Sequence, residues 1–61
     1  MTNDQKNVVR ALWTDLRKSY PDLTLEIVET QAVSQLAGEK AKGIIGMFVH
    51  DTFVKAGWIR Q

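Results

Sequence analysis

The sequence contains no cysteine and only one histidine, His50. Without cysteine, the chain has neither disulfide bonds nor thiolate ligands for a metal ion. A single imidazole leaves no pattern for a nucleophile paired with a general base. His50 is followed by Asp51, but adjacent side chains on a helix point about 100° apart and do not face each other. We therefore expect no catalytic residues, no metal and no cofactor, and we expect the protein not to be an enzyme.

Long apolar runs are also lacking. The longest, residues 43–49 (GIIGMFV), is far shorter than the ~20 residues that a membrane-spanning helix needs. The sequence shows no apolar core of a signal peptide. We predict a protein without membrane contact, located in the cytoplasm, where a lack of cysteine is ordinary.

Neither sign of charge is in large excess, because the formal net charge is +1. The total charge therefore does not favour nucleic acid as a partner. The distribution is uneven, since residues 19–39 contain no lysine or arginine and four acidic residues: Asp22, Glu26, Glu29 and Glu39. Mainly basic segments flank them, which predicts an acidic element beside two basic ones, suited to directional contacts. The simpler interpretation is that these are the solvated faces of a small bundle.

The length of the chain limits how much surface it can bury. The 61 residues suffice for one domain, residues 1–61. A domain of this size buries only about 60% of the surface that its unfolded chain exposes. Such scaffolds usually add disulfides, a metal or a partner, and the first two are not expected here. We therefore predict a homo-oligomer.

A first helix is predicted over about residues 3–20. Thr2 and Gln5 match the capping box, in which a hydroxyl and a side-chain amide pair with the first free backbone N–H groups. Pro21 stops the helix, because the residue before a proline disfavours helical geometry. Apolar residues at helical spacing form one face: Val9, Leu12, Trp13, Leu16 and Tyr20.

The middle segment permits two interpretations. Leu23, Leu25 and Ile27 alternate with polar residues, which is typical of a strand, and a short extended pair at residues 23–25 is one alternative. A helix over about residues 25–37 is favoured, because Thr24 can cap it and Leu23 can pack on Val28 as a hydrophobic staple. The helix then presents an apolar stripe: Leu25, Val28, Ala32 and Leu36.

A third helix is predicted over about residues 40–56, or from near Gly43. Gly38 suits the end of the second helix, and Gly57 suits the end of the third, with Trp58 or Ile59 folding back as an apolar contact. The expected core face of the third helix is one broad arc: Ile45, Phe48, Val49, Thr52, Phe53 and Ala56. The predicted fold is therefore all-α, a three-helix bundle that is helix-turn-helix-like.

The second half of the chain carries small, apolar and glycine residues at characteristic spacings: Ala32, Leu36, Gly38, Ile44, Val49, Phe53 and KAGWI at residues 55–59. This pattern resembles the helix-turn-helix of winged-helix regulators. The resemblance implies DNA binding and transcriptional regulation, through the start of the third helix, by a dimer on two half-sites. The residues that it implicates in DNA binding are Lys40, Lys42, Lys55 and His50.

The sequence departs from that family in two ways. The four residues after Gly57 are too few for a two-stranded wing. Opposite the core arc, the third helix has Ile44, Met47, His50, Asp51 and Val54, whereas base edges are usually read by Arg, Lys, Asn, Gln or Ser.

The same outward face supports a second hypothesis, that of a protein-interaction module or a small inhibitor. Ile44, Met47 and Val54 make an apolar strip on a helix whose other side already faces the core, and a helix that is apolar nearly all round is covered on both sides. We expect another chain to supply that cover. The alternative is that the third helix is central in a monomer, between the first helix and residues 58–59.

The first helix offers one further surface. Lys6, Arg10 and Arg17 lie within about 40° of one another on a helical wheel, beside Trp13. A basic stripe with an aromatic edge can bind a nucleic-acid backbone or an acidic protein. The favoured interpretation is that the arginines cover Trp13 at the edge of the core.

Overall fold

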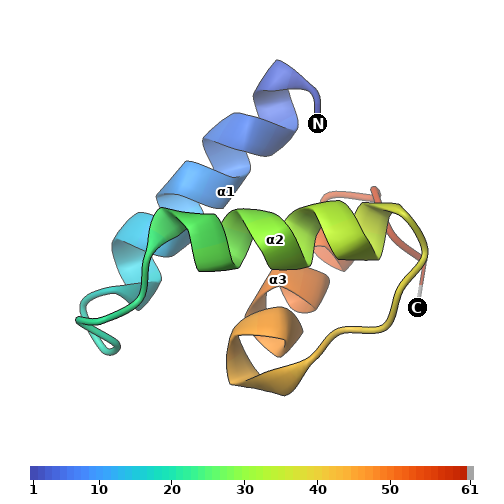
Figure 1. Cartoon of the computed structure of the whole chain (residues 1–61). Helices are drawn as coiled ribbons and strands as arrows, with labels where there is room; N and C mark the ends of the chain where they lie inside the picture. The colour runs from blue at the N-terminus through green and yellow to red at the C-terminus, as the bar shows by residue number, and fades with distance from the viewer. Residues whose placement is uncertain (61) are drawn as a thin grey trace.

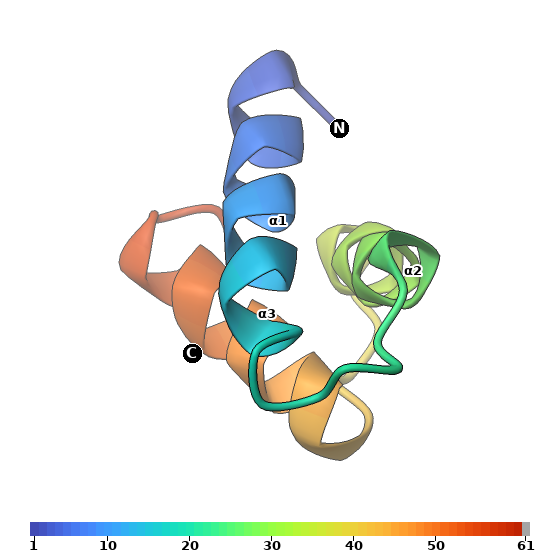
Figure 2. The ribbon, with the colours of Figure 1, turned by 90° about the vertical axis from the view of Figure 1, so that its left-hand side faces the viewer.

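The computed structural model describes residues 1–60, and within that range it contains three helices and no strand. They are α1 (Asn3–Leu16), α2 (Leu25–Leu36) and α3 (Gly43–Lys55). Figure 1 shows α2 crossing in front of α1, with α3 beneath it. In Figure 2, α2 is seen along its axis while α1 runs from top to bottom, so these two helices cross steeply. The all-α, three-helix prediction is confirmed.

The capping box at the start of α1 is confirmed. The Gln5 N–H donates to Thr2 Oγ1 at 3.1 Å, and the Thr2 N–H donates to Gln5 Oε1 at 2.8 Å. The predicted end of this helix is wrong, because α1 stops at Leu16 instead of continuing to Tyr20. The N–H groups of residues 19 and 20 both turn back to the Leu16 carbonyl. Tyr20 is consequently exposed rather than part of the apolar face.

Because α1 ends early, the residues that follow it fold back over the last turns of this helix. Leu23 is buried in the core, and its carbonyl accepts a hydrogen bond from Trp13 Nε1 at 2.9 Å. The helical interpretation of the next segment is confirmed, because Thr24 caps α2 by accepting the Ile27 N–H at 3.3 Å. Leu23 and Val28 are both buried in the core cluster, as the staple predicts.

Helices α2 and α3 end in the same way. The residue after each C-cap is a glycine with positive φ, 95° at Gly38 and 80° at Gly57. The following N–H then reaches back across the last turn, from Glu39 to the Ser34 carbonyl at 3.0 Å and from Trp58 to the Phe53 carbonyl at 2.9 Å. This is the Schellman arrangement. The apolar contact that usually accompanies it is present at the end of α3, where the rings of Phe53 and Trp58 meet edge to face with their centroids 5.3 Å apart.

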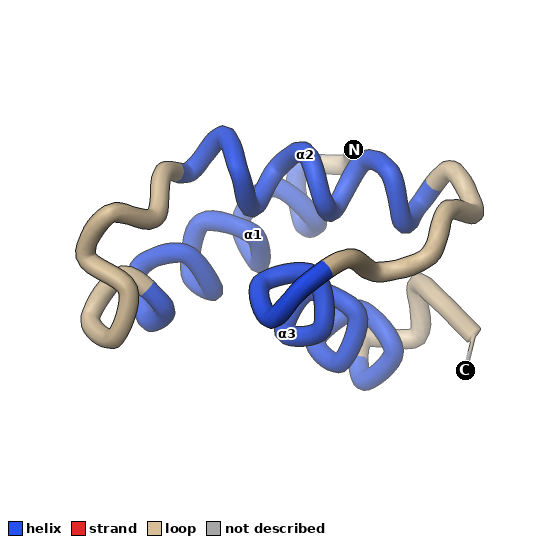
Figure 3. Tube along the Cα trace, turned by 60° about the horizontal axis from the view of Figure 1, so that its bottom comes forward, coloured by secondary structure: helices blue, strands red, loops and turns tan. Residues whose placement is uncertain are grey.

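The third helix begins at Gly43 rather than Lys40 because the preceding residues are extended. Lys42 has φ −122° and ψ 127°, and its side chain makes no capping bond. Figure 3 shows this loop, in tan, returning alongside α2 to the start of α3. The Lys42 N–H donates to Gln31 Oε1 on α2 at 3.3 Å, which fixes the returning segment to α2.

The core lies where α2 packs against both other helices. Its buried apolar residues are Val9, Leu16, Leu23, Val28, Ala32, Val49 and Phe53. The predicted core arc of α3 was too broad, because Phe48 is 41% exposed and Ala56 is also exposed. Direct contact between α1 and α3 is slight.

Candidate interaction surface

The outward face of α3 carries a group of exposed apolar side chains. Ile44 is 62% exposed, Met47 61% and Phe48 41%, and with Asp51 they line one shallow depression. We call Ile44, Met47 and Phe48 the α3 strip. The helical spacing of these residues puts them on one face, and no other helix packs over it. Large apolar side chains that gather on a surface often mark a binding site.

The strip has a charged border on its C-terminal side. Lys55 Nζ lies 3.0 Å from Asp51 Oδ2, one turn away on the same helix. Both side chains are largely exposed, so this pair contributes only about 0.3–0.5 kcal/mol to stability. Its main effect is local, since it reduces the net charge beside the apolar strip.

Two lysines precede α3, but neither lines the depression of the strip. Lys40 and Lys42 are exposed, and within residues 1–60 neither forms an ion pair. They stand before the helix N-terminus, whose free N–H groups carry a partial positive charge. This end of α3 therefore attracts anionic groups.

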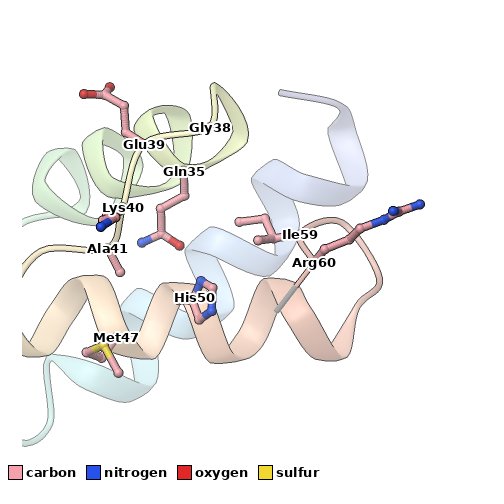
Figure 4. A pocket seen from close by; sticks show the side chains of 9 residues that line it. All are labelled: Gln35, Gly38, Glu39, Lys40, Ala41, Met47, His50, Ile59 and Arg60. Atoms are coloured by element: carbon pink, nitrogen blue, oxygen red, sulfur yellow. The ribbon is translucent and has the colours of Figure 1, made fainter.

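A groove adjoins the strip at Met47, which lines both, and lies between the end of α2, the α2–α3 loop and the C-terminal segment. Figure 4 shows the Gln35 amide projecting from α2 toward α3, between Ala41 and Ile59, with His50 close below it. Gln35 is 4% exposed, and its Nε2 donates to the Gly46 carbonyl at 2.8 Å. This bond ties α2 to α3 where the two helices approach closely.

The charged side chains that line the groove do not come together at one point. Gln35 Oε1 is buried and accepts no hydrogen bond from residues 1–60, although an amide oxygen has lone pairs for two. The side chains of Glu39 and Arg60 point away from the groove in Figure 4. The groove therefore offers one acceptor and an imidazole in an apolar setting, and its charges do not converge on an anion or a cation.

The structure separates the residues that were predicted to bind DNA. Lys40 and Lys42 precede α3, whereas Lys55 is its last residue and is paired with Asp51. A helix of 13 residues is about 20 Å long, so Lys55 lies far from the other two. His50 is half-buried and lines the groove, not the strip.

The residues predicted to bind a protein are divided in a similar way. Ile44 and Met47 are strongly exposed, but Val54 is half-buried and is not part of the exposed surface. Phe48 takes its place in the strip. In the sequence, Phe48 lies at the edge of the predicted core arc. A residue at that position can face either the core or the solvent.

The basic stripe of α1 is partly occupied by intramolecular contacts. The Arg17 guanidinium carbon lies 4.6 Å from the ring centroid of Trp13, and Trp13 Nε1 is bonded to the Leu23 carbonyl. Arg17 thus covers the edge of the core, as the favoured interpretation holds. Lys6 and Arg10 remain exposed on α1.

Comparisons of this chain with protein-family models, with curated proteins and with solved structures found no match. Within residues 1–60, no helix has both the length and the apolar character needed to cross a membrane.

Proposed function

We propose that this protein is a non-enzymatic protein-interaction module that docks through the α3 strip. The observation that carries the proposal is the exposure of Ile44, Met47 and Phe48 together on one face of α3. Burying such side chains gains roughly 25 cal/mol for each Å² of apolar surface removed from water. Met47 at the centre is a flexible side chain that adapts to an opposing surface.

The chemistry of this face suits a protein better than DNA. In a helix-turn-helix protein, the second helix of the motif enters the major groove and its side chains meet base edges. Here that helix would present the apolar strip and the carboxylate of Asp51. Only one basic residue lies within α3, and it is the paired Lys55. Base readout needs hydrogen-bonding side chains, and the strip has none.

The proposal is tested by photocrosslinking in the cells that produce the protein, with a photoreactive amino acid incorporated at one position of the chain at a time. The two positions are Met47, in the strip, and Val33, an apolar residue of α2 that is 54% exposed. Illumination should yield a defined protein adduct from position 47 and little or none from position 33. The absence of an adduct at 47, or equal labelling at both positions, would contradict docking through the strip.

DNA binding of the helix-turn-helix kind is the second candidate. It is supported by the exposed Lys40 and Lys42 at the start of α3 and by the resemblance of residues 32–59 to that motif. The connection, residues 37–42, is longer than the 3–4-residue turn of the motif, which weakens the case. If the protein binds DNA, affinity for mixed-sequence duplex should fall steeply with salt. The double variant Lys40→Glu/Lys42→Glu should then lose binding, and unchanged affinity would exclude this model.

A further inference from the structure

Sulfur is present at only two positions of the chain, because the sequence has two methionines and no cysteine. Met47 lies in the α3 strip and is 61% exposed, whereas Met1 precedes α1 and is 39% exposed. Peroxides oxidise the thioether of methionine as well as the thiol of cysteine, and they react more readily with accessible sulfur. Since no thiol competes, Met47 presents the most accessible sulfur to a peroxide.

Met47 also occupies the point where two surfaces of the molecule meet. It lines both the depression of the strip and the groove beside α2, so a change in this one side chain alters both. It does not belong to the buried core cluster. Its chemistry can therefore change without removing apolar side chains from the core.

We propose that Met47 is a redox-sensitive modification site, and that its oxidation to methionine sulfoxide by a peroxide releases the partner of the α3 strip. This inference rests on the proposed function, because it names a regulation of the same surface. The observation that carries it is the position of an exposed thioether among the apolar side chains through which the protein docks.

The reaction transfers one oxygen atom from the peroxide to the side chain. The sulfur of Met47 attacks a peroxide oxygen with its lone pair, so that an S–O bond forms while the O–O bond breaks. Sulfur is oxidised, and the electron pair of the broken bond stays on the leaving oxygen. With hydrogen peroxide, this leaving hydroxide takes up the proton of the transferred oxygen and becomes water. Methionine sulfoxide reductases reverse the oxidation, one enzyme for each epimer of the sulfoxide.

The new oxygen changes what a partner must bury. A sulfoxide is polar and chiral, whereas the thioether is flexible and apolar. Docking through the strip would take this oxygen out of water, and burying a polar group without a hydrogen bond is unfavourable. We expect oxidation to weaken docking roughly tenfold or more. A docked partner in turn covers the sulfur, so it should slow the oxidation of Met47.

Mass spectrometry of the purified protein after limited treatment with hydrogen peroxide tests the site. The sulfoxide should form at Met47 in preference to Met1, at a rate close to that of a short unstructured peptide containing methionine. The circular dichroism and the urea denaturation midpoint should stay as in the untreated protein, because Met47 lies outside the core. Slower oxidation at Met47 than at Met1, or unfolding on oxidation, overturns the proposal.

Photocrosslinking before and after oxidation tests the consequence for docking. The photoreactive amino acid replaces Ile44, so that Met47 remains in the chain. The purified protein is added to an extract of the producing cells untreated, after oxidation with hydrogen peroxide, and after oxidation followed by repair with both reductases. At limiting concentration, the adduct should be weaker by roughly tenfold or more in the oxidised sample and restored in the repaired one.

Met47→Leu provides the matched control, since leucine is similar in volume to methionine and has no sulfur to oxidise. In this variant, the adduct after peroxide treatment should equal the adduct before it. Loss of the adduct from oxidised Met47→Leu, or an undiminished adduct from the fully oxidised wild type, overturns the proposal.

The two proposals fail in different ways. An adduct at position 44 that is equal in all three samples overturns regulation by oxidation and leaves the α3 strip as a docking surface. The absence of an adduct from the untreated protein contradicts docking itself and overturns both.

Discussion

At the residue scale, Gly46 is the position where a single added carbon has the clearest consequence. It is buried on α3 opposite α2, and its carbonyl accepts the Gln35 amide. A Cβ at this position would lie 2.7 Å from Gln31 Oε1 and 3.3 Å from the carbonyl carbon of Ala41. The closeness of α2 and of the α2–α3 loop therefore favours glycine at this position.

We expect Gly46→Ala to lower the free energy of unfolding by about 1 kcal/mol. Alanine gains up to about 1 kcal/mol in helix propensity, but forcing Gln31 aside and crowding the loop costs about 1–3 kcal/mol. The measurement is the urea denaturation midpoint. In a Gln31→Ala background, the same change should cost much less, because the nearest obstructing atom is gone. An equal cost in both backgrounds would show that Gln31 is not the obstacle.

At the element scale, the helix ends are defined by local chemistry. Thr2 and Thr24 cap α1 and α2 with side-chain oxygens, and the two glycine-containing motifs end α2 and α3. The motif at Gly57 does more than end a helix, because it directs Trp58 back onto Phe53 in the core.

We expect Gly57→Ala to destabilise the protein by about 1 kcal/mol, since an L-residue with a side chain is strained at a φ of 80°. Nothing lies within 4 Å of the added Cβ, so crowding does not contribute. Gly57→Asn should cost less, because asparagine tolerates this conformation better than alanine. Thermal or urea unfolding of the two variants provides the comparison, and equal losses would point to a cause other than backbone strain.

The sequence predicted best the features that depend on residues close together in the chain. The capping box, the Thr24 cap, the staple of Leu23 on Val28 and both glycine ends depend on short spacings. The early end of α1 was missed because Pro21 was the only stop signal used, whereas the N–H groups of residues 19 and 20 turn back to the Leu16 carbonyl. The bond between Trp13 and the Leu23 carbonyl was not predictable either, since it forms only when the chain has folded back.

The candidate surface was predictable only in part, for a related reason. Ile44 and Met47 lie opposite the core arc, so the pattern alone places them outside. Phe48 was assigned to the core arc and Val54 to the opposite face, whereas Phe48 is 41% exposed and Val54 is half-buried. The spacing within one helix does not show how the other elements pack against it. Gln35 gave no signal, because a glutamine in an apolar stripe is recognised as buried only once its acceptor, the Gly46 carbonyl, lies beside it.

At the scale of the whole molecule, α2 holds the fold together, since it packs against both α1 and α3 while these two scarcely meet. The strip of Ile44, Met47 and Phe48 on α3 remains largely exposed to solvent. Substitutions in the binding surface and in the core should therefore have separate effects. Changes at Met47 should alter binding, whereas changes at Gly46 should alter the packing of the helices.

The positions of the two tryptophans make the unmodified chain its own optical probe. Trp13 is hydrogen-bonded to the segment before α2, and Trp58 packs against Phe53 at the far end of α3. Neither belongs to the α3 strip, so each indole should respond to loosening of its own region rather than to binding at the strip. Single-tryptophan proteins, with phenylalanine at the other site, would thus separate by fluorescence the detachment of α1 from the fraying of the chain's last turn.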